Sequence, residues 1–429
     1  MIRGLRVALA LGLAASLASA ACAETEATVE TAETAETTVT VESTVSVEDT
    51  ATVENAPSLE RYLRPPDPGF PYQWNLENTG QRVRENEEQR GVYDADIDAV
   101  EAFAAGHYGR DVTIALIGAG FRWAGSPLEP VLWRNPREIP GNGLDDDGNG
   151  LVDDFHGYDF AERDSDPHSS GWHDLVVAEM AVAPHDRRTV AGIAPQARLM
   201  LIKIADDSGR ILMSPLPQAI LYALQQHARV IFMPWSAKGK QCGAPEFAHL
   251  SRFIQQASEH ALIIGGRPGE WPACLPGVVS VRASRPDDRP EGTPASDVDF
   301  AAPGADGRSK VYPSNAIGVA AGAATLVFAQ DPSRTPAEVR KLLARTADRV
   351  HPEIRPYRGG RNVFFGAGRI NVARALGTDF DGDGILDADD ADADGDDIPD
   401  VQDACTLDPD PECTEPARQG QKEQKSDGS

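Results

Sequence analysis

The sequence predicts an α/β fold in which helices cover both faces of a parallel sheet. Short apolar runs bounded by turn residues alternate with longer stretches in which apolar residues recur at helical spacing. The apolar runs lie at 112–117, 198–204, 230–233, 262–264 and 278–281, and the helical stretches among them at 214–227 and 248–260. Strands that alternate with helices form parallel sheets, because each crossover places a helix against the sheet.

Two later segments add helices to this pattern. Small residues at 320–324 follow Ala316 and predict a buried helix that its neighbours approach closely. Thr335, Pro336 and Glu338 then have the layout of a capping box, with a hydroxyl at the cap, a proline in the first turn and an acid three residues on. The chain has 429 residues, which is enough for one large domain with appendages.

The first 22 residues have the layout of a secretory signal peptide. Arg3 and Arg6 precede an apolar run at 7–17, and small residues follow up to Cys22. The run is too short to span a bilayer. We therefore expect an exported protein without a transmembrane span, secreted or held in the cell envelope (periplasm or outer surface). An alternative is that Cys22 becomes a lipidated first residue, which would anchor the protein as a lipoprotein.

Most of the formal net charge of −27 lies in two segments. Residues 23–55 consist almost wholly of Ala, Thr, Val and Glu, with nine acidic residues and no basic one, and we expect a low-complexity tether. Residues 379–415 hold sixteen acidic residues and no Lys or Arg. The rest of the chain is close to neutral, which excludes the basic surface that nucleic acid or anionic lipid requires.

A glycine-rich turn follows the first predicted strand, at Gly118 and Gly120. Such a turn opens dinucleotide-binding sites, but here Trp123 occupies the place of the third glycine. No acid follows at the end of an early second strand either. We therefore exclude a dinucleotide site.

Three aspartate-rich loops have the spacing of calcium sites. Calcium takes about six to eight oxygen ligands, and alternate Asp or Asn side chains around a glycine turn supply them. The predicted ligands are Asp145, Asp147, Asn149 and Asp153 in the first loop, Asp379, Asp381, Asp383 and Asp387 in the second, and Asp392, Asp394, Asp396 and Asp400 in the third. With Cys405, the last two loops resemble a thrombospondin type 3 calcium repeat. The alternative is an acidic tail without fixed structure.

Residues 70–376 resemble the subtilisin-like serine peptidases, or subtilases. The pieces that carry the resemblance are Y-Q-W-N-L-E-N-T-G-Q at 72–81, N-P-R-E-I-P-G-N-G-L-D-D-D-G-N-G at 135–150, V-A-G-I-A-P-Q-A at 190–197 and D-F-A-A-P-G at 299–304. The resemblance implies a subtilisin-like parallel sheet with helices on both faces. With the terminal features, it divides the chain into a signal peptide (1–22), a tether (23–64), a peptidase domain (65–377), a calcium-binding segment (378–413) and a polar tail (414–429).

The active-site positions of this resemblance match less well. The acid that ends the first strand in the family's I-D-T-G is replaced by Gly118. His173 falls at the position of the catalytic base, but Asp174 and larger residues replace the small ones that follow it, which puts the tight packing of that helix in doubt. Arg267 stands in place of the oxyanion Asn, and Ser314 falls at the position of the nucleophile.

These replacements predict a loss of activity. Loss of the acid alone costs roughly four orders of magnitude in turnover, and loss of one oxyanion donor costs a factor of about 10² to 10³. The simpler interpretations are then that His173 is an idle remnant and that Ser314 caps a helix. Pro234 also removes a backbone donor from the edge on which an extended peptide would pair.

We therefore expect an exported pseudopeptidase that acts by binding or regulation, with Ca²⁺ as its cofactor and a peptide or protein ligand in the degenerate cleft. The first alternative is an active serine endopeptidase with a His173/Ser314 dyad and Arg267 as oxyanion donor. The second is a calcium-dependent surface adhesion module.

The cysteines form two candidate disulfides for an oxidising compartment. Cys242 and Cys274 follow strands that are neighbours in the subtilase sheet, so the resemblance implies that their loops meet. Cys405 and Cys413 form the second pair. The alternative for Cys242 and Cys274 is a pair of free thiols.

Overall fold

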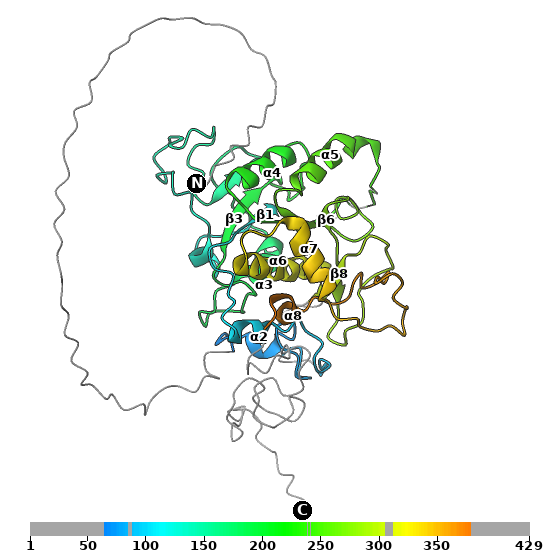
Figure 1. Cartoon of the computed structure of the whole chain (residues 1–429). Coiled ribbons are helices and arrows are strands. Elements are labelled where there is room, and N and C mark those ends of the chain that lie inside the picture. Colours follow the sequence, from blue (N-terminus) through cyan, green and yellow to red (C-terminus); the bar gives the residue numbers. More distant parts are fainter. Residues whose placement is uncertain (1–63, 85–87, 238, 241, 305–311, 379–429) are drawn as a thin grey trace, which may run out of the picture. The chain divides into compact units, whose positions relative to one another are not determined.

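The central sheet is parallel, and all its strands except β2 (Gly157–Asp159) come from the apolar runs of the sequence (Figure 1). The computed structural model of the protein describes residues 64–84, 88–237, 239–240, 242–304 and 312–378. In this part of the chain the sheet has the order β2-β3-β1-β4-β5-β6. The strands are β1 (Thr113–Gly118), β2 (Gly157–Asp159), β3 (Arg198–Lys203), β4 (Val230–Met233), β5 (Leu262–Gly265) and β6 (Val278–Val279). The α/β class expected from the sequence is thus confirmed.

The two faces of the sheet form two separate hydrophobic cores. Successive side chains of a strand point to opposite faces. Ile114 and Leu116 accordingly belong to one core, and Ala115 and Ile117 to the other. The first core includes α3 (His173–Val182) and α6 (Pro313–Gln330), and the second includes α4 (Leu216–Gln225) and α5 (Ala248–Ala257). Figure 1 shows α4 and α5 on one side of the strands and α3 and α6 on the other.

Helix α6 is the buried helix predicted from the small-residue run, and it packs closely against α3. A Cβ added to Gly318 would lie 2.2 Å from the carbonyl oxygen of Val177 in α3. A Cβ added to Gly322 would lie 2.7 Å from the Cβ of Ile193. The helix after His173 therefore packs closely although larger residues replace the small ones there, because glycines on α6 provide the close approach.

The remaining elements frame these cores. They are the helices α2 (Ala99–Ala104), α7 (Pro336–Arg345) and α8 (Val372–Leu376), and the 3₁₀ turns Phe70–Tyr72, Glu129–Val131 and Pro245–Phe247. Helix α7 begins with the predicted capping box, in which Thr335 and Glu338 exchange hydrogen bonds between side chain and backbone. The segment predicted as one strand at 278–281 is divided at Ser280, whose backbone pairs with Asp299 instead. After it, β7 (Val281–Ser284) pairs with β8 (Phe300–Pro303) in a second sheet.

The Cys242–Cys274 disulfide is present, with 5.7 Å between the Cα atoms. Because β4 and β5 are neighbours in the sheet, the loops that follow them meet, as expected. No helix in the described ranges is long and apolar enough to cross a bilayer. The Cys405–Cys413 pair, Cys22 and the two predicted calcium loops at 379–400 lie outside the described residues.

Candidate active site

The candidate site lies where the carboxyl ends of β1, β4 and β5 meet the first turns of α3 and α6. Ligand sites of parallel sheets form at this edge, because the loops after the strands converge there. A pocket of about 350 Å³ opens at this point. Its lining includes His173, Trp235, Arg267 and Ser314. The structure therefore brings together the base, oxyanion and nucleophile positions that the resemblance implies.

His173 contacts a hydroxyl on one side of its ring and a carboxylate on the other. Its Nε2 lies 3.0 Å from Oγ of Ser314, and its Nδ1 lies 2.8 Å from Oδ1 of Asp174. Hydrogen-bond distance on both sides is the arrangement by which an imidazole takes a proton from a serine while a carboxylate fixes its tautomer. The expectation that His173 has no carboxylate on its far nitrogen is therefore wrong.

The carboxylate of Asp174 is held by the backbone at the end of β1. Its Oδ2 accepts hydrogen bonds from the backbone N–H groups of Ala119, at 2.6 Å, and Gly120, at 3.1 Å. Asp174 is only 3% exposed, whereas the side chain of His173 is 49% exposed. A buried carboxylate needs such donors, because burial of an unpartnered charge is costly. The buried carboxylate of Asp174 is thus fixed by the backbone at the end of β1, whereas the His173 ring that it contacts is partly exposed to solvent.

Ser314 is the second residue of α6, and it does not cap the helix. The cap residue is Tyr312, and no side-chain hydrogen bond caps this helix end. The interpretation of Ser314 as a helix cap is therefore wrong, because its hydroxyl lies against His173 instead. The backbone N–H of Ser314 belongs to the first turn of α6, where N–H groups have no carbonyl partner within the helix. It is therefore available to an oxygen in the pocket.

The loops after β4 and β5 form the walls of the pocket. The backbone N–H of Arg267 donates to Oγ of Ser236 at 2.5 Å, which joins the two walls. Nε1 of Trp235 donates to the carbonyl of Ile117 at 2.8 Å and fixes the first wall to β1. The Arg267 side chain is exposed and lines the pocket, and it has no hydrogen bond or ion pair to any other residue that the structure describes.

Two aromatic rings stand at the rim of the pocket. Trp172 immediately precedes His173, and Tyr312 lies two residues before Ser314. Their exposed fractions are 59% and 40%, and their ring centroids lie 6.4 Å apart in an edge-to-face contact. Exposed aromatic side chains beside a pocket provide apolar contact surface for a bound chain.

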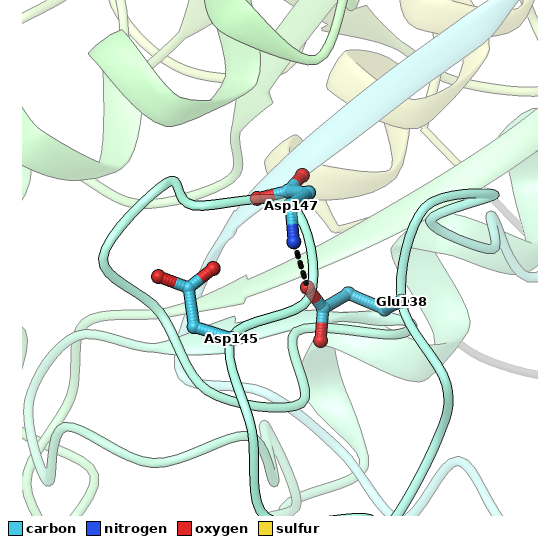
Figure 2. A group of neighbouring side chains, drawn as sticks. All are labelled: Glu138, Asp145 and Asp147. Atoms are coloured by element: carbon cyan, nitrogen blue, oxygen red, sulfur yellow. Dashed lines mark hydrogen bonds between the residues drawn. The ribbon is translucent and has the colours of Figure 1, made fainter. Parts of the chain in front are cut away.

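A second site lies in the loop at 138–153, where three carboxylates approach one another. Oxygens of Glu138, Asp145 and Asp147 lie within 4.8 Å of one another. Figure 2 shows the three side chains and the hydrogen bond between the backbone of Asp147 and Glu138. Oε1 of Glu138 accepts hydrogen bonds from the backbone N–H groups of Asp146 and Asp147, at 3.0 and 3.1 Å. Its Oε2 is buried without a hydrogen-bond partner. An orphaned carboxylate oxygen beside two further acids fits a hard cation such as Ca²⁺, which prefers oxygen ligands.

Asp153, one of the ligands predicted in this loop, lies outside the group of carboxylates. Oδ1 and Oδ2 of Asp153 accept backbone N–H groups of Asn142 and Gly143, so this side chain holds a turn. The Asn149 side chain joins the loop to Asp154, and burial raises the pKa of Asp154 to about 6. Glu138 belongs to the group although it was not predicted, because it precedes the D-x-D motif by seven residues.

The sequence interpretation also missed Asp174. The signal was present as a coincidence of two changes: an acid is lost at Gly118, and another is gained immediately after the base. Only the packing of α3 against the end of β1 shows that the Asp174 carboxylate lies directly beside Gly118.

Comparisons with known proteins identify the family of this chain. The model of the Subtilase family matches residues 41–368. The chain is 28% identical over 236 residues to the thermophilic serine proteinase of Bacillus sp. (strain AK1), which covers 51% of this chain and 56% of that protein. It is 26% identical over 237 residues to thermitase of Thermoactinomyces vulgaris, covering 51% and 80%. The crystal structure of fervidolysin from Fervidobacterium pennivorans aligns with a TM-score of 0.48 at 18% identity, covering 63% of this chain and 43% of that one.

Proposed function

Because the chain belongs to the Subtilase family, we propose that it is a serine endopeptidase in which Ser314 is the nucleophile and His173 the general base. The single observation that carries this proposal is the position of the His173 ring between the Ser314 hydroxyl and a carboxylate. A serine hydroxyl is a weak nucleophile until an adjacent base accepts its proton. The contact of 3.0 Å provides that base.

The reaction follows from the contacts of the ring. Oγ of Ser314 attacks the carbonyl carbon of a peptide bond, and its proton passes to Nε2 of His173. The same proton then goes to the departing amine, which leaves an acyl group on Ser314. Water, deprotonated by His173, attacks the acyl group and releases the second product, and the proton returns to Ser314.

The negative oxygen of the tetrahedral intermediate needs donors. We propose that the backbone N–H of Ser314 is one and the guanidinium of Arg267 the other. A first-turn helix N–H is already oriented and lies at the positive end of the helix dipole. Arg267 lines the same pocket, and its guanidinium carries several N–H donors. A long cationic side chain replaces a short amide here, so it brings charge as well as a hydrogen bond.

A second candidate function is the binding of a peptide without hydrolysis. The observation that favours it is the wall of the pocket, where Pro234 removes a backbone donor for an added strand and Arg267 replaces a short oxyanion donor. The missing acid no longer supports it, because Asp174 contacts His173. A calcium-dependent adhesion module would depend on the loops at 379–400, which lie outside the described residues.

We also propose that Ca²⁺ is held by Glu138, Asp145 and Asp147 and that the protein acts after export. The cation would offset the repulsion of three neighbouring carboxylates and fix the loop that leads to β2. Export is supported by the signal-like first 22 residues and by the Cys242–Cys274 disulfide, since such bonds persist in oxidising compartments.

The test uses the purified full chain and a serine-directed fluorophosphonate. We expect wild-type protein to be labelled at Ser314 and to cleave casein, and we expect Ser314→Ala to lose both. A folded wild-type protein that neither takes up the probe nor cleaves casein would contradict the peptidase proposal and favour peptide binding.

A further inference from the structure

We infer that the positioning acid of this site has moved from position 118 to position 174, and that Gly118 and Asp174 form one reciprocal exchange. The inference rests on the proposed serine peptidase function, in which Asp174 acts through His173. Beyond that function, we infer that the Asp174 carboxylate occupies the space that an acidic side chain at position 118 would fill. Position 118 must therefore be a glycine.

The backbone at the end of β1 is the first argument. Two N–H groups there, of Ala119 and Gly120, point at one oxygen of Asp174. An acid at position 118 would sit at this same strand end. The other oxygen of Asp174 contacts Nδ1 of His173, so a single carboxylate joins the strand end to the base. The N–H groups that hold the carboxylate thus lie at the end of β1, while the carboxylate itself comes from α3.

The space around Gly118 is the second argument. A Cβ added to Gly118 would lie 2.2 Å from Oδ2 and 3.0 Å from Cγ of Asp174. Gly118 is the last residue of β1, in ordinary strand conformation, so its backbone would accept a side chain. What excludes one is the carboxylate of Asp174. Two acids cannot occupy this place together, because they would overlap and repel each other.

The position of Asp174 on its helix is the third argument. Neighbouring residues of a helix do not normally face each other. The contact forms here through Nδ1, the ring nitrogen nearest the histidine backbone, and through the short side chain of aspartate. Asp174 also lies in the first turn of α3, where a negative charge interacts favourably with the helix dipole.

The experiment measures the rate constant for fluorophosphonate labelling of Ser314. Asp174→Asn keeps the shape of the side chain, and we expect a loss of about 10³- to 10⁴-fold, the range for a wrongly oriented base. The matched control is Asp111→Asn, which makes the same change at the opposite end of β1 and should label at the wild-type rate. Labelling of Asp174→Asn within threefold of wild type would overturn the inference.

The exchange itself is tested by moving the acid back. Gly118→Asp alone should label far more slowly than wild type, because two carboxylates compete for one place. Gly118→Asp with Asp174→Ala should label at least tenfold faster than Asp174→Ala alone. A double variant no faster than Asp174→Ala would show that the two positions do not share one place.

A last variant guards against a folding defect in the others. Gly118→Ala leaves Asp174 intact but pushes its carboxylate from the strand end, and we expect about a hundredfold slower labelling. The protein should still unfold cooperatively, at a lower temperature than wild type, because the buried carboxylate loses hydrogen bonds. Wild-type labelling by Gly118→Ala would overturn the steric argument. Failure of the wild-type chain to label at all would instead count against the peptidase function.

Discussion

At the scale of single residues, the proposed oxyanion donor Arg267 is a cation, whereas the family motif has a neutral Asn at this position. Arg267 brings a permanent positive charge to the same pocket as Ser314. The hydrogen bond from the backbone N–H of Arg267 to Ser236 fixes the position from which the side chain extends. A cationic donor strengthens contact with a developing negative charge more than with a neutral carbonyl.

We expect Arg267→Ala to lower kcat by a factor of about 10² to 10³, with KM changed little, because the contact strengthens in the transition state. Arg267→Asn should retain part of this activity through a shorter neutral donor. Steady-state kinetics on casein-derived fluorogenic peptides measure both values. An unchanged kcat in Arg267→Ala would exclude the guanidinium as an oxyanion donor.

We expect Trp172→Ala to raise KM severalfold with little change in kcat, because the ring offers contact surface next to the base but takes no part in proton transfer. The exposed Leu221 lies on α4, which covers the opposite face of the sheet, so Leu221→Ala is the control. Equal KM values for wild type and Trp172→Ala would exclude a role of the ring in substrate binding.

The sequence could predict His173, Ser314 and Arg267 because each lies at a fixed place in a linear motif. It could not predict Asp174 in the same way. The acid comes from α3, the same helix as the base, and not from the end of β1. Its place is defined by backbone N–H groups at the end of β1 rather than by spacing along the chain.

At the scale of elements, α3 carries the proposed base and α6 the proposed nucleophile, so the packing of these two helices sets the distance between His173 and Ser314. The close approach depends on Gly318, where a Cβ would lie 2.2 Å from a carbonyl oxygen of α3. The sequence predicted a buried helix from the small residues that follow Ala316, whereas α6 already begins at Pro313, a residue typical of a helix's first turn. The short strands β2 and β8 were not predicted, since β2 contains a glycine and an aspartate and β8 two alanines and a proline, which are residue types depleted in strands.

We expect Gly318→Ala to lower the free energy of unfolding by about 1 to 3 kcal/mol, because a methyl group must push α3 and α6 apart. Labelling of Ser314 should slow as well, since the pair of catalytic side chains separates. Urea unfolding measures the first effect, and Gly171→Ala is the control, as its added Cβ meets nothing closer than 3.4 Å. Equal stability of Gly318→Ala and wild type would contradict this account of the packing.

At the scale of the whole molecule, two groups of acidic side chains should make the stability of the protein depend on calcium and on pH. The loop at 138–153 carries three neighbouring carboxylates, which a cation would neutralise. A second group of buried acids lies near the start of the domain, where burial raises the pKa of Asp96 to about 8 and the neighbouring Glu101 charge adds to the shift. Asp96 nevertheless accepts backbone N–H groups of Asn78 and Asp98, so it orders this region.

We expect chelation of calcium to lower the thermal unfolding temperature of the protein, and Glu138→Gln to reduce the difference between calcium-loaded and chelated samples. The buried Oε2 of Glu138 is the oxygen that would lose its partner. Glu259→Gln, at an exposed carboxylate between α5 and β5, is the control. Identical unfolding temperatures for wild type with and without calcium would exclude a stabilising cation at any site in the chain.

We expect the buried Asp96 to make the protein less stable as pH rises. Its pKa in the folded state, about 8, lies above the unfolded value near 3.8, so the folded state binds the proton more tightly. The free energy of unfolding should therefore fall between about pH 4 and 8. Asp96→Asn should flatten this slope in urea unfolding measured at pH 5, 6, 7 and 8, and an unchanged slope would contradict the raised pKa.

The shared place of Gly118 and Asp174 restricts how this arrangement can arise or revert. From a chain with an acid at 118, gain of Asp174 first crowds two carboxylates into one space, and loss of the first acid leaves the base without orientation. Either order of single substitutions passes through an impaired protein. On the proposed function, each substitution is therefore expected to be tolerated only in the presence of the other. Relatives that carry Asp at the position of Asp174 should accordingly also carry Gly at the position of Gly118.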